Sequence, residues 1–205
     1  KIESKLNLDN LILNHDSDKI KKLVKNYNNL INFKESKINF KYLDEKFFID
    51  GSSECYIDKN FKNLIKFKIE KNKNKTKFET FLNLKNLELI IGDITYKKIK
   101  GDEATLQING FKNNEKIFLK QINYKENNNK IELNDLEINS NKILNIDTIK
   151  LDFLNIYNFK NQINLIKNNN NYALTGRSFD STQLINNISN SESDKNFFEI
   201  FENLN

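Results

Sequence analysis

Apolar and polar residues alternate along much of the chain, most clearly between residues 76 and 153. Phe78 and Leu82 fall on one side of the alternation, and Lys77 and Glu79 fall on the other. A period of two residues is typical of a β-strand, whose successive side chains point to opposite faces of the sheet. The pattern therefore predicts strands with one apolar face and one polar face.

Short polar stretches separate these alternating runs, as at residues 112–115 and 126–129. Their asparagine, aspartate and glycine residues suit tight turns, because they tolerate positive φ and bond to their own backbone. Strands that follow one another every ~10–14 residues through short turns indicate an antiparallel meander. The alternation changes phase at residues 134–135 and 147–148, which predicts bulges or short breaks there.

Three segments show helical spacing instead. Apolar residues recur at i, i+3, i+4 and i+7 near residues 18–32, which predicts a short amphipathic helix capped by Asp16, Ser17 or Asp18. Two short helices are expected at the C-terminal end, one after Asp180 and one over residues 197–204.

Together these patterns predict a mainly β fold: a long, curled antiparallel β-meander with an apolar concave face that forms a groove. We expect a single domain over residues 1–205, with a less regular start (1–75), the meander (76–180) and a helical end (181–205). Two arrangements of the apolar face are open. The sheet can fold on itself into a sandwich or barrel, or it can curl into a trough that holds another molecule.

Composition narrows the classes of function. The 205 residues carry a net charge of +5, and Arg177 is the only arginine beside many lysines. Abundant lysine, asparagine and isoleucine with no proline indicate an A/T-rich genome, so the lysine excess is weak evidence for nucleic-acid binding. No apolar run reaches the ~18 residues that a transmembrane helix needs.

Catalytic and metal chemistry have few candidates. The single histidine, His15, and the single cysteine, Cys55, argue against a multi-histidine metal site, a disulfide framework and a histidine-based relay. Acidic neighbours occur in three places, and we expect them at turns or on the solvated face: Asp44 with Glu45, Asp102 with Glu103, and Asp135 with Glu137. We therefore predict no enzyme activity, no cofactor and no metal.

The remaining candidate site is the apolar face itself, and the alternating runs predict which side chains line it. They are Phe78, Leu82, Leu84, Leu87, Leu89, Leu106, Ile108, Ile117, Leu119, Ile131 and Leu133.

Several spaced strand signatures carry a resemblance to a known family. They are Leu82-x-Leu84-x-x-Leu87-x-Leu89, Thr95-Tyr96-x-Lys98-x-x-Gly101-x-x-Ala104-x-Leu106-x-Ile108-x-Gly110, Ile131-x-Leu133-x-x-Leu136, Ile149-x-Leu151-x-Phe153 and Tyr172-x-Leu174-x-Gly176-x-Ser178-Phe179-Asp180. From about Leu82 to its end, the chain resembles the AsmA-like superfamily, and specifically the YhdP-type envelope proteins of Gram-negative bacteria.

This resemblance implies an internal segment of a longer periplasmic protein that is anchored in the inner membrane. It implies a non-catalytic hydrophobic groove that binds phospholipid acyl chains during transport between the inner and outer membranes. Contact with the two membranes would be made by parts outside this segment, and no nucleic acid would be bound. The alternatives are a closed β-sandwich module for binding or adhesion and a basic nucleic-acid-binding domain.

Overall fold

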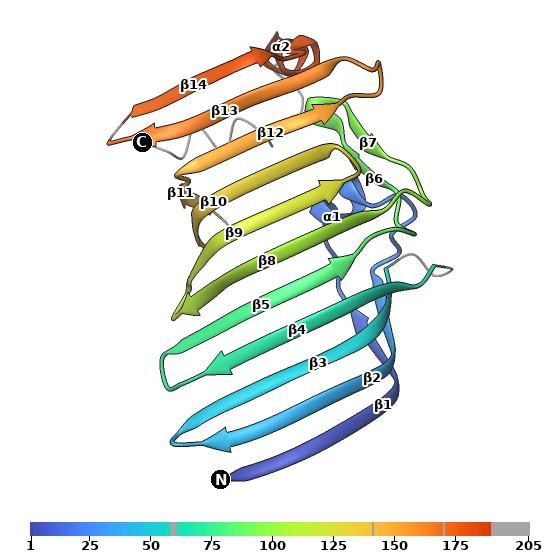
Figure 1. The fold of residues 1–205 in the computed structure, drawn as a ribbon, viewed down its shortest axis with the longest axis vertical. Coiled ribbons are helices and arrows are strands. Elements are labelled where there is room, and N and C mark those ends of the chain that lie inside the picture. Colours follow the sequence, from blue (N-terminus) through green and yellow to red (C-terminus); the bar gives the residue numbers. More distant parts are fainter. Residues whose placement is uncertain (58–60, 141, 170, 190–205) are drawn as a thin grey trace.

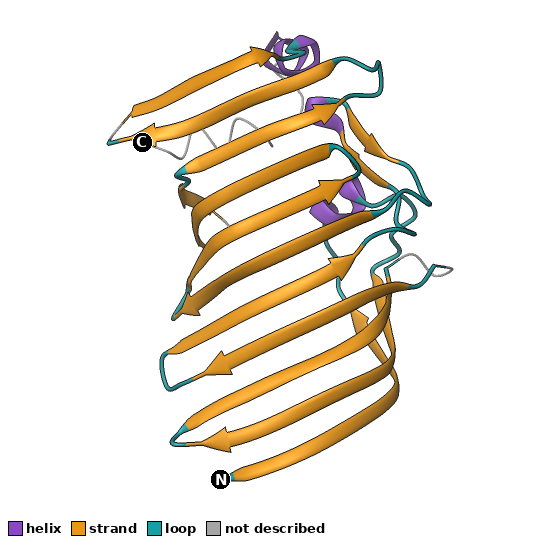
Figure 2. Ribbon diagram, viewed as in Figure 1, coloured by secondary structure: helices purple, strands orange, loops and turns teal. Residues whose placement is uncertain are grey.

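One large antiparallel sheet dominates the structure, a computed structural model that describes residues 1–57, 61–140, 142–169 and 171–189 (Figures 1 and 2). Its 12 strands include β11 (Lys142–Asn145), which pairs only with β10. In spatial order the other strands are β1 (Ile2–Asn14), β2 (Leu30–Leu43), β3 (Lys46–Tyr56), β4 (Asn63–Lys71), β5 (Lys75–Asn83), β8 (Ala104–Asn113), β9 (Lys116–Glu126), β10 (Asn129–Asn139), β12 (Thr148–Leu154), β13 (Lys160–Asn168) and β14 (Asn171–Ser178).

Among the described residues, five small elements lie outside this sheet. They are the hairpin of β6 (Leu89–Ile91) and β7 (Tyr96–Lys98), the 3-10 turn η1 (Gly92–Ile94) between them, and the helices α1 (Asp18–Leu23) and α2 (Thr182–Ser189). The predicted mainly β meander is confirmed. Among the described residues the sheet does not close, because β1 and β14 each pair with one neighbour only.

Strand register places the alternating residues on two opposite faces. Phe40 of β2 pairs with Ile49 of β3, which pairs with Ile69 of β4, which in turn pairs with Phe78 of β5. The neighbouring row, one residue along each strand, consists of Asn39, Asp50, Lys68 and Glu79. The sheet therefore has one apolar face and one polar face, as the alternation predicts.

The predicted phase changes coincide with irregular backbone. Asp135 in β10 has a φ of 52°, and residues 146–147 separate β11 from β12. Positive φ values at Asn114 and Asn127 form the predicted turns at residues 112–115 and 126–129. These local features keep the apolar residues of successive strands on the same face, since a one-residue slip would reverse them.

Gly110 lies where the register between β8 and β9 shifts, and its backbone approaches β9 closely. A Cβ atom added here would lie 2.1 Å from the carbonyl oxygen of Phe118. Gly110→Ala is therefore expected to lower the free energy of unfolding by about 1–3 kcal/mol, because β9 must shift to make room. Gly92→Ala, whose added Cβ would meet nothing within 4 Å, is the control in the same denaturation experiment. Equal effects of the two substitutions would contradict this account.

The buried core lies over one half of the apolar face. Its sheet residues come mainly from β8 to β13, and among them Phe153 is completely buried (0% exposed). The residues that cover them come from α1 and the turn after it, from the β6–β7 hairpin, and from residue 146 between β11 and β12. Figure 1 shows β1 and β2 bending toward α1 and β6. The ends of β1 and β2 therefore bend toward the elements that cover the apolar face.

A buried polar cluster fastens the hairpin to the sheet. The Tyr96 hydroxyl lies 2.8 Å from the Tyr124 hydroxyl and donates a hydrogen bond to the carboxylate of Glu126. The ammonium of Lys98 donates to the carbonyl oxygens of Lys85, Leu87 and Ile99. Burial raises the pKa of Tyr96 and lowers that of Lys98. Because these polar groups have partners, the cluster can remain in a dry core.

The helices differ from the expectation in extent. Ser17 accepts a hydrogen bond from the Ile20 N–H and caps α1, but the helix ends at Leu23 rather than near residue 32. Val24 is extended and forms a bridge to Leu89, and Asn26 has a φ of 64°. A left-handed residue and a β-bridge so close to Leu23 are incompatible with further helix.

At the C-terminal end, α2 forms where the first of two helices was expected. Asp180 accepts a hydrogen bond from the Thr182 N–H, which is consistent with the predicted acidic cap. The second predicted helix, over residues 197–204, lies outside the described residues.

Candidate functional site

The apolar face of the sheet is covered over one half and uncovered over the other. In the uncovered half the side chains are exposed or half-buried, and none belongs to the core cluster. We call this surface the open face, and it consists of Leu6, Ile38, Phe40, Ile49, Ile65, Phe67, Ile69, Phe78, Ile108 and Ile117. Soluble proteins rarely expose a contiguous apolar surface without using it.

The central rows of the open face cross β2, β3, β4, β5 and β8 without a charged side chain, and the nearest charges on this face are Lys71 and Lys112 at the strand ends. Along one row, Ile38 pairs with Gly51, Gly51 with Phe67, and Phe67 with Thr80. The Phe67 ring covers the space beside Gly51, where an added Cβ would lie 2.8 Å from the ring. Four strand spacings of ~4.8 Å make the row about 19 Å long. One leaflet of the hydrocarbon core is ~15 Å thick, so the row can accommodate one extended acyl chain.

The eleven predicted lining residues occupy four kinds of position. Phe78, Ile108 and Ile117 lie on the open face, whereas Leu84 and Ile131 are buried core residues. Four others, Leu82, Leu106, Leu119 and Leu133, are half-buried and pack against the core.

Leu87 and Leu89 do not lie on the large sheet. Leu87 precedes β6 and Leu89 begins it, so both belong to the segment that covers the apolar face. Sequence reasoning also left six open-face residues of β2 to β4 out of the predicted lining: Ile38, Phe40, Ile49, Ile65, Phe67 and Ile69. Alternation is visible from residue 65 to residue 69, and this signal could have identified the last three.

The polar face carries the hollow of the sheet. A shallow depression of about 990 Å³ runs across β1 to β8 between two rows of mostly polar side chains. Its lining includes Lys37, Asn39, Lys66, Lys68 and Glu79. The open face, on the other side of the same strands, is uncovered and apolar. The two faces therefore suit different ligands, polar on one side and apolar on the other.

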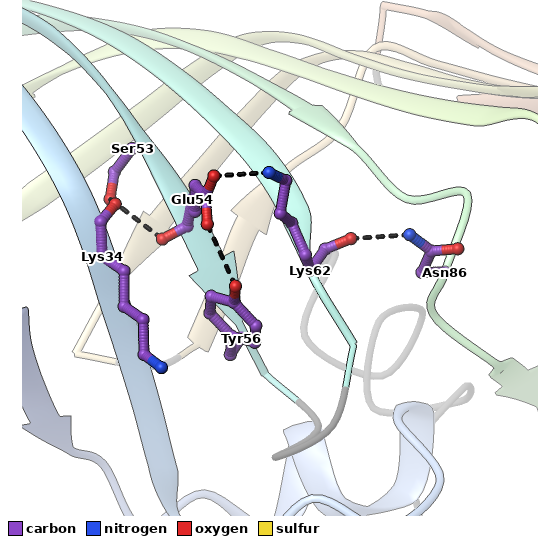
Figure 3. A network of polar contacts seen from close by, with 6 residues as sticks. All are labelled: Lys34, Ser53, Glu54, Tyr56, Lys62 and Asn86. Atoms are coloured by element: carbon purple, nitrogen blue, oxygen red, sulfur yellow. Dashed lines mark hydrogen bonds and ion pairs between the residues drawn. The ribbon is translucent and has the colours of Figure 1, made fainter.

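A polar network on β2 to β4 joins strand ends near the covered half (Figure 3). The Tyr56 hydroxyl donates a 3.0 Å hydrogen bond to Glu54, and the Lys62 ammonium also pairs with Glu54. The Lys62 hydrogen bond, and then that of Tyr56, lower the pKa of Glu54. The side-chain amide of Asn86 donates to the carbonyl oxygen of Lys62 at 2.7 Å. These contacts hold β3, β4 and the segment after β5 together.

The other candidate residues are separate from one another. Glu103 pairs with Lys85, Glu45 with Lys73, and Glu137 with Lys116. His15 is exposed, and its carbonyl oxygen accepts the Tyr27 hydroxyl. In the described part of the chain, no group of three or more histidine, cysteine, aspartate or glutamate residues could hold a metal ion.

Cys55 is buried at 2% exposure, and burial raises the pKa of its thiol to about 11. We therefore expect folded protein at pH 8 to react with a disulfide reagent at least tenfold more slowly than unfolded protein, because reaction needs an accessible thiolate. The thiol of the unfolded chain has a pKa of about 9 and so loses its proton at a lower pH than the buried thiol. The free energy of unfolding should therefore also fall as the pH rises from 9 toward 11. Equal reaction rates in native and denaturing buffer would contradict the buried assignment.

No helix in the described ranges is both long and apolar enough to cross a bilayer. Comparison of the chain with protein-family models, curated proteins and solved structures found no match. The likeness to AsmA-like proteins therefore stays a prediction.

Proposed function

We propose that the chain is a non-catalytic lipid-binding segment that holds phospholipid acyl chains on its open face. The supporting observation is the uncharged row across β2, β3, β4, β5 and β8, in which Ile38, Phe67 and Ile108 alternate with Gly51 and Thr80 and which the core leaves uncovered. Following the resemblance, we place this activity in phospholipid transport between the inner and outer membranes of a Gram-negative cell.

The energetics favour a mobile, weakly held ligand. Complete transfer of one CH₂ group out of water contributes about 0.8 kcal/mol. A chain that lies on an unroofed surface loses water on one side only, so each CH₂ contributes roughly half of that value. Because the attraction is non-directional, a chain can slide from one strand to the next without breaking a specific bond.

Two phenylalanines on one strand provide a matched test. Phe78 lies on the open face, whereas Phe81, also half-buried in β5, pairs with Lys66 and Gln107 on the polar face. We expect Phe78→Asp to stay folded, since its carboxylate keeps part of its hydration, and to lose most of its bound lipid. Phe81→Asp introduces the same charge on the opposite face and should keep its lipid.

The measurement is native mass spectrometry of the purified chain and both variants, together with a thermal melt of each. A severalfold fall in phospholipid occupancy for Phe78→Asp alone supports the proposal. Equal occupancy in the two folded variants, or no lipid on the parent chain after incubation with phospholipid, would rule the open face out.

A further inference from the structure

The connection between β12 and β13 lies at the strand ends beside the β6–β7 hairpin (Figure 1). It exposes several large apolar side chains. We call residues 154–159 the tip loop. Four of its six side chains are apolar or aromatic and well exposed: Leu154 (45%), Ile156 (52%), Tyr157 (71%) and Phe159 (45%). No charged residue occurs within it.

The loop holds this conformation through one buried side chain. Asn155 is 4% exposed, and its amide oxygen accepts hydrogen bonds from the Tyr157 N–H at 2.9 Å and the Phe159 N–H at 3.0 Å. Its amide nitrogen donates to the Thr95 hydroxyl at 3.1 Å and to Asp180 at 2.8 Å. The exposed side chains are therefore presented by a fixed turn.

The backbone N–H groups of the loop are satisfied inside the protein. Besides the two that Asn155 accepts, the Ile156 N–H donates to the carbonyl of Thr95 at 3.0 Å. The Asn158 N–H donates to the carbonyl oxygen of Asn155, and the Asn155 N–H donates to the carbonyl oxygen of Phe159. All five N–H groups from residue 155 to residue 159 thus have protein acceptors. These five donors therefore need no water, so the loop can lose hydration around its N–H groups at little cost.

In the apolar part of a bilayer each unpaired backbone group costs several kcal/mol, so a loop whose N–H donors are already paired can approach that region at a lower cost. Tyrosine also suits the boundary between water and acyl chains, since its ring is apolar and its hydroxyl can stay hydrated. We propose that the tip loop inserts into the interfacial layer of a lipid bilayer and docks the sheet on a membrane. This membrane contact is distinct from acyl-chain binding on the open face.

A fluorescence experiment can test the insertion directly, because the chain contains no tryptophan. Tyr157→Trp would place a single reporter in the loop, and Leu174→Trp would place one at a similarly exposed position (64%) on β14. Vesicles of phosphatidylcholine are the probe, since their neutral surface removes the attraction that a net charge of +5 would cause. We expect a blue shift for the loop reporter and its quenching by brominated acyl chains, and neither for the β14 reporter.

Flotation with the same vesicles supplies a second reading. Ile156→Asp should weaken vesicle binding roughly tenfold or more while the protein stays folded, since membrane affinity follows buried apolar area. The Leu174→Asp protein should bind vesicles as strongly as the parent chain. The Phe78→Asp protein should also bind vesicles as strongly, even where it no longer binds lipid on the open face. The two proposals can therefore fail separately.

Three outcomes would overturn the docking proposal. One is an unshifted emission from the Tyr157→Trp protein in the presence of vesicles. Another is an equal response of the two reporters. The third is a blue shift that depends on protein concentration and not on lipid, which would assign the loop to a contact between proteins.

Discussion

Phe153→Ala is expected to lower the free energy of unfolding by about 3–5 kcal/mol, the range for removing a buried aromatic ring. Phe153 is 0% exposed, and its ring meets the Tyr96 ring edge-on with centroids 5.4 Å apart. A domain is typically stable by about 5–15 kcal/mol, so this one substitution should remove a large share of the total.

The matched control is Phe78→Ala on the open face. Phe78 is half-buried and outside the core cluster, so its removal should cost less than half as much in the same urea titration. Similar costs at the two positions would mean that the two halves of the apolar face are equally covered, which contradicts the division between core and open face.

Lys98→Met is expected to cost about 1–3 kcal/mol, the range for leaving buried acceptors without their donor. Methionine keeps most of the side-chain volume but leaves the carbonyls of Lys85, Leu87 and Ile99 without their donor. The substitution also removes the positive charge that acts on the buried carboxylate of Glu126.

The neighbouring residue provides the comparison. Lys97 is exposed and pairs with Glu88 at 3.0 Å, so Lys97→Met should cost less than about 1 kcal/mol. Chemical denaturation measures both values, and amide hydrogen exchange shows whether β6 and β7 open first in the Lys98 variant. A Lys98→Met protein as stable as the Lys97→Met protein would show that the ammonium does not fasten the hairpin.

The strands were the predictable part of this fold because the information for them is local. Alternation between residues 76 and 153 gives the direction of each side chain, and the asparagine-rich turns fix antiparallel neighbours. The less regular alternation before residue 75 also has a local cause. Asp9 of β1 and Glu35 of β2 lie opposite each other at a gap in the β1–β2 pairing, and Glu35 has a φ of 50°.

What covers the sheet could not be predicted, because it depends on long-range contacts. Leu87 and Leu89 resume the alternation after Leu84 one residue out of phase, and they belong to a short segment and hairpin that turn back over the face that they were expected to line. The burial of Lys98 has no sequence signal, since its acceptors are backbone carbonyls. The same holds for Asn155, whose role in the tip loop depends on Thr95 and Asp180.

The central claim is that acyl chains lie on the open face, and photo-crosslinking tests it most directly. A fatty acid with a diazirine near its methyl end would be bound to the purified chain, irradiated, and mapped by peptide mass spectrometry. We expect labels on open-face residues of β3, β4 and β5, such as Ile49, Phe67 and Phe78, which excess unlabelled phospholipid displaces. Labels confined to the polar face around Phe81, or spread evenly over both faces, would contradict the account.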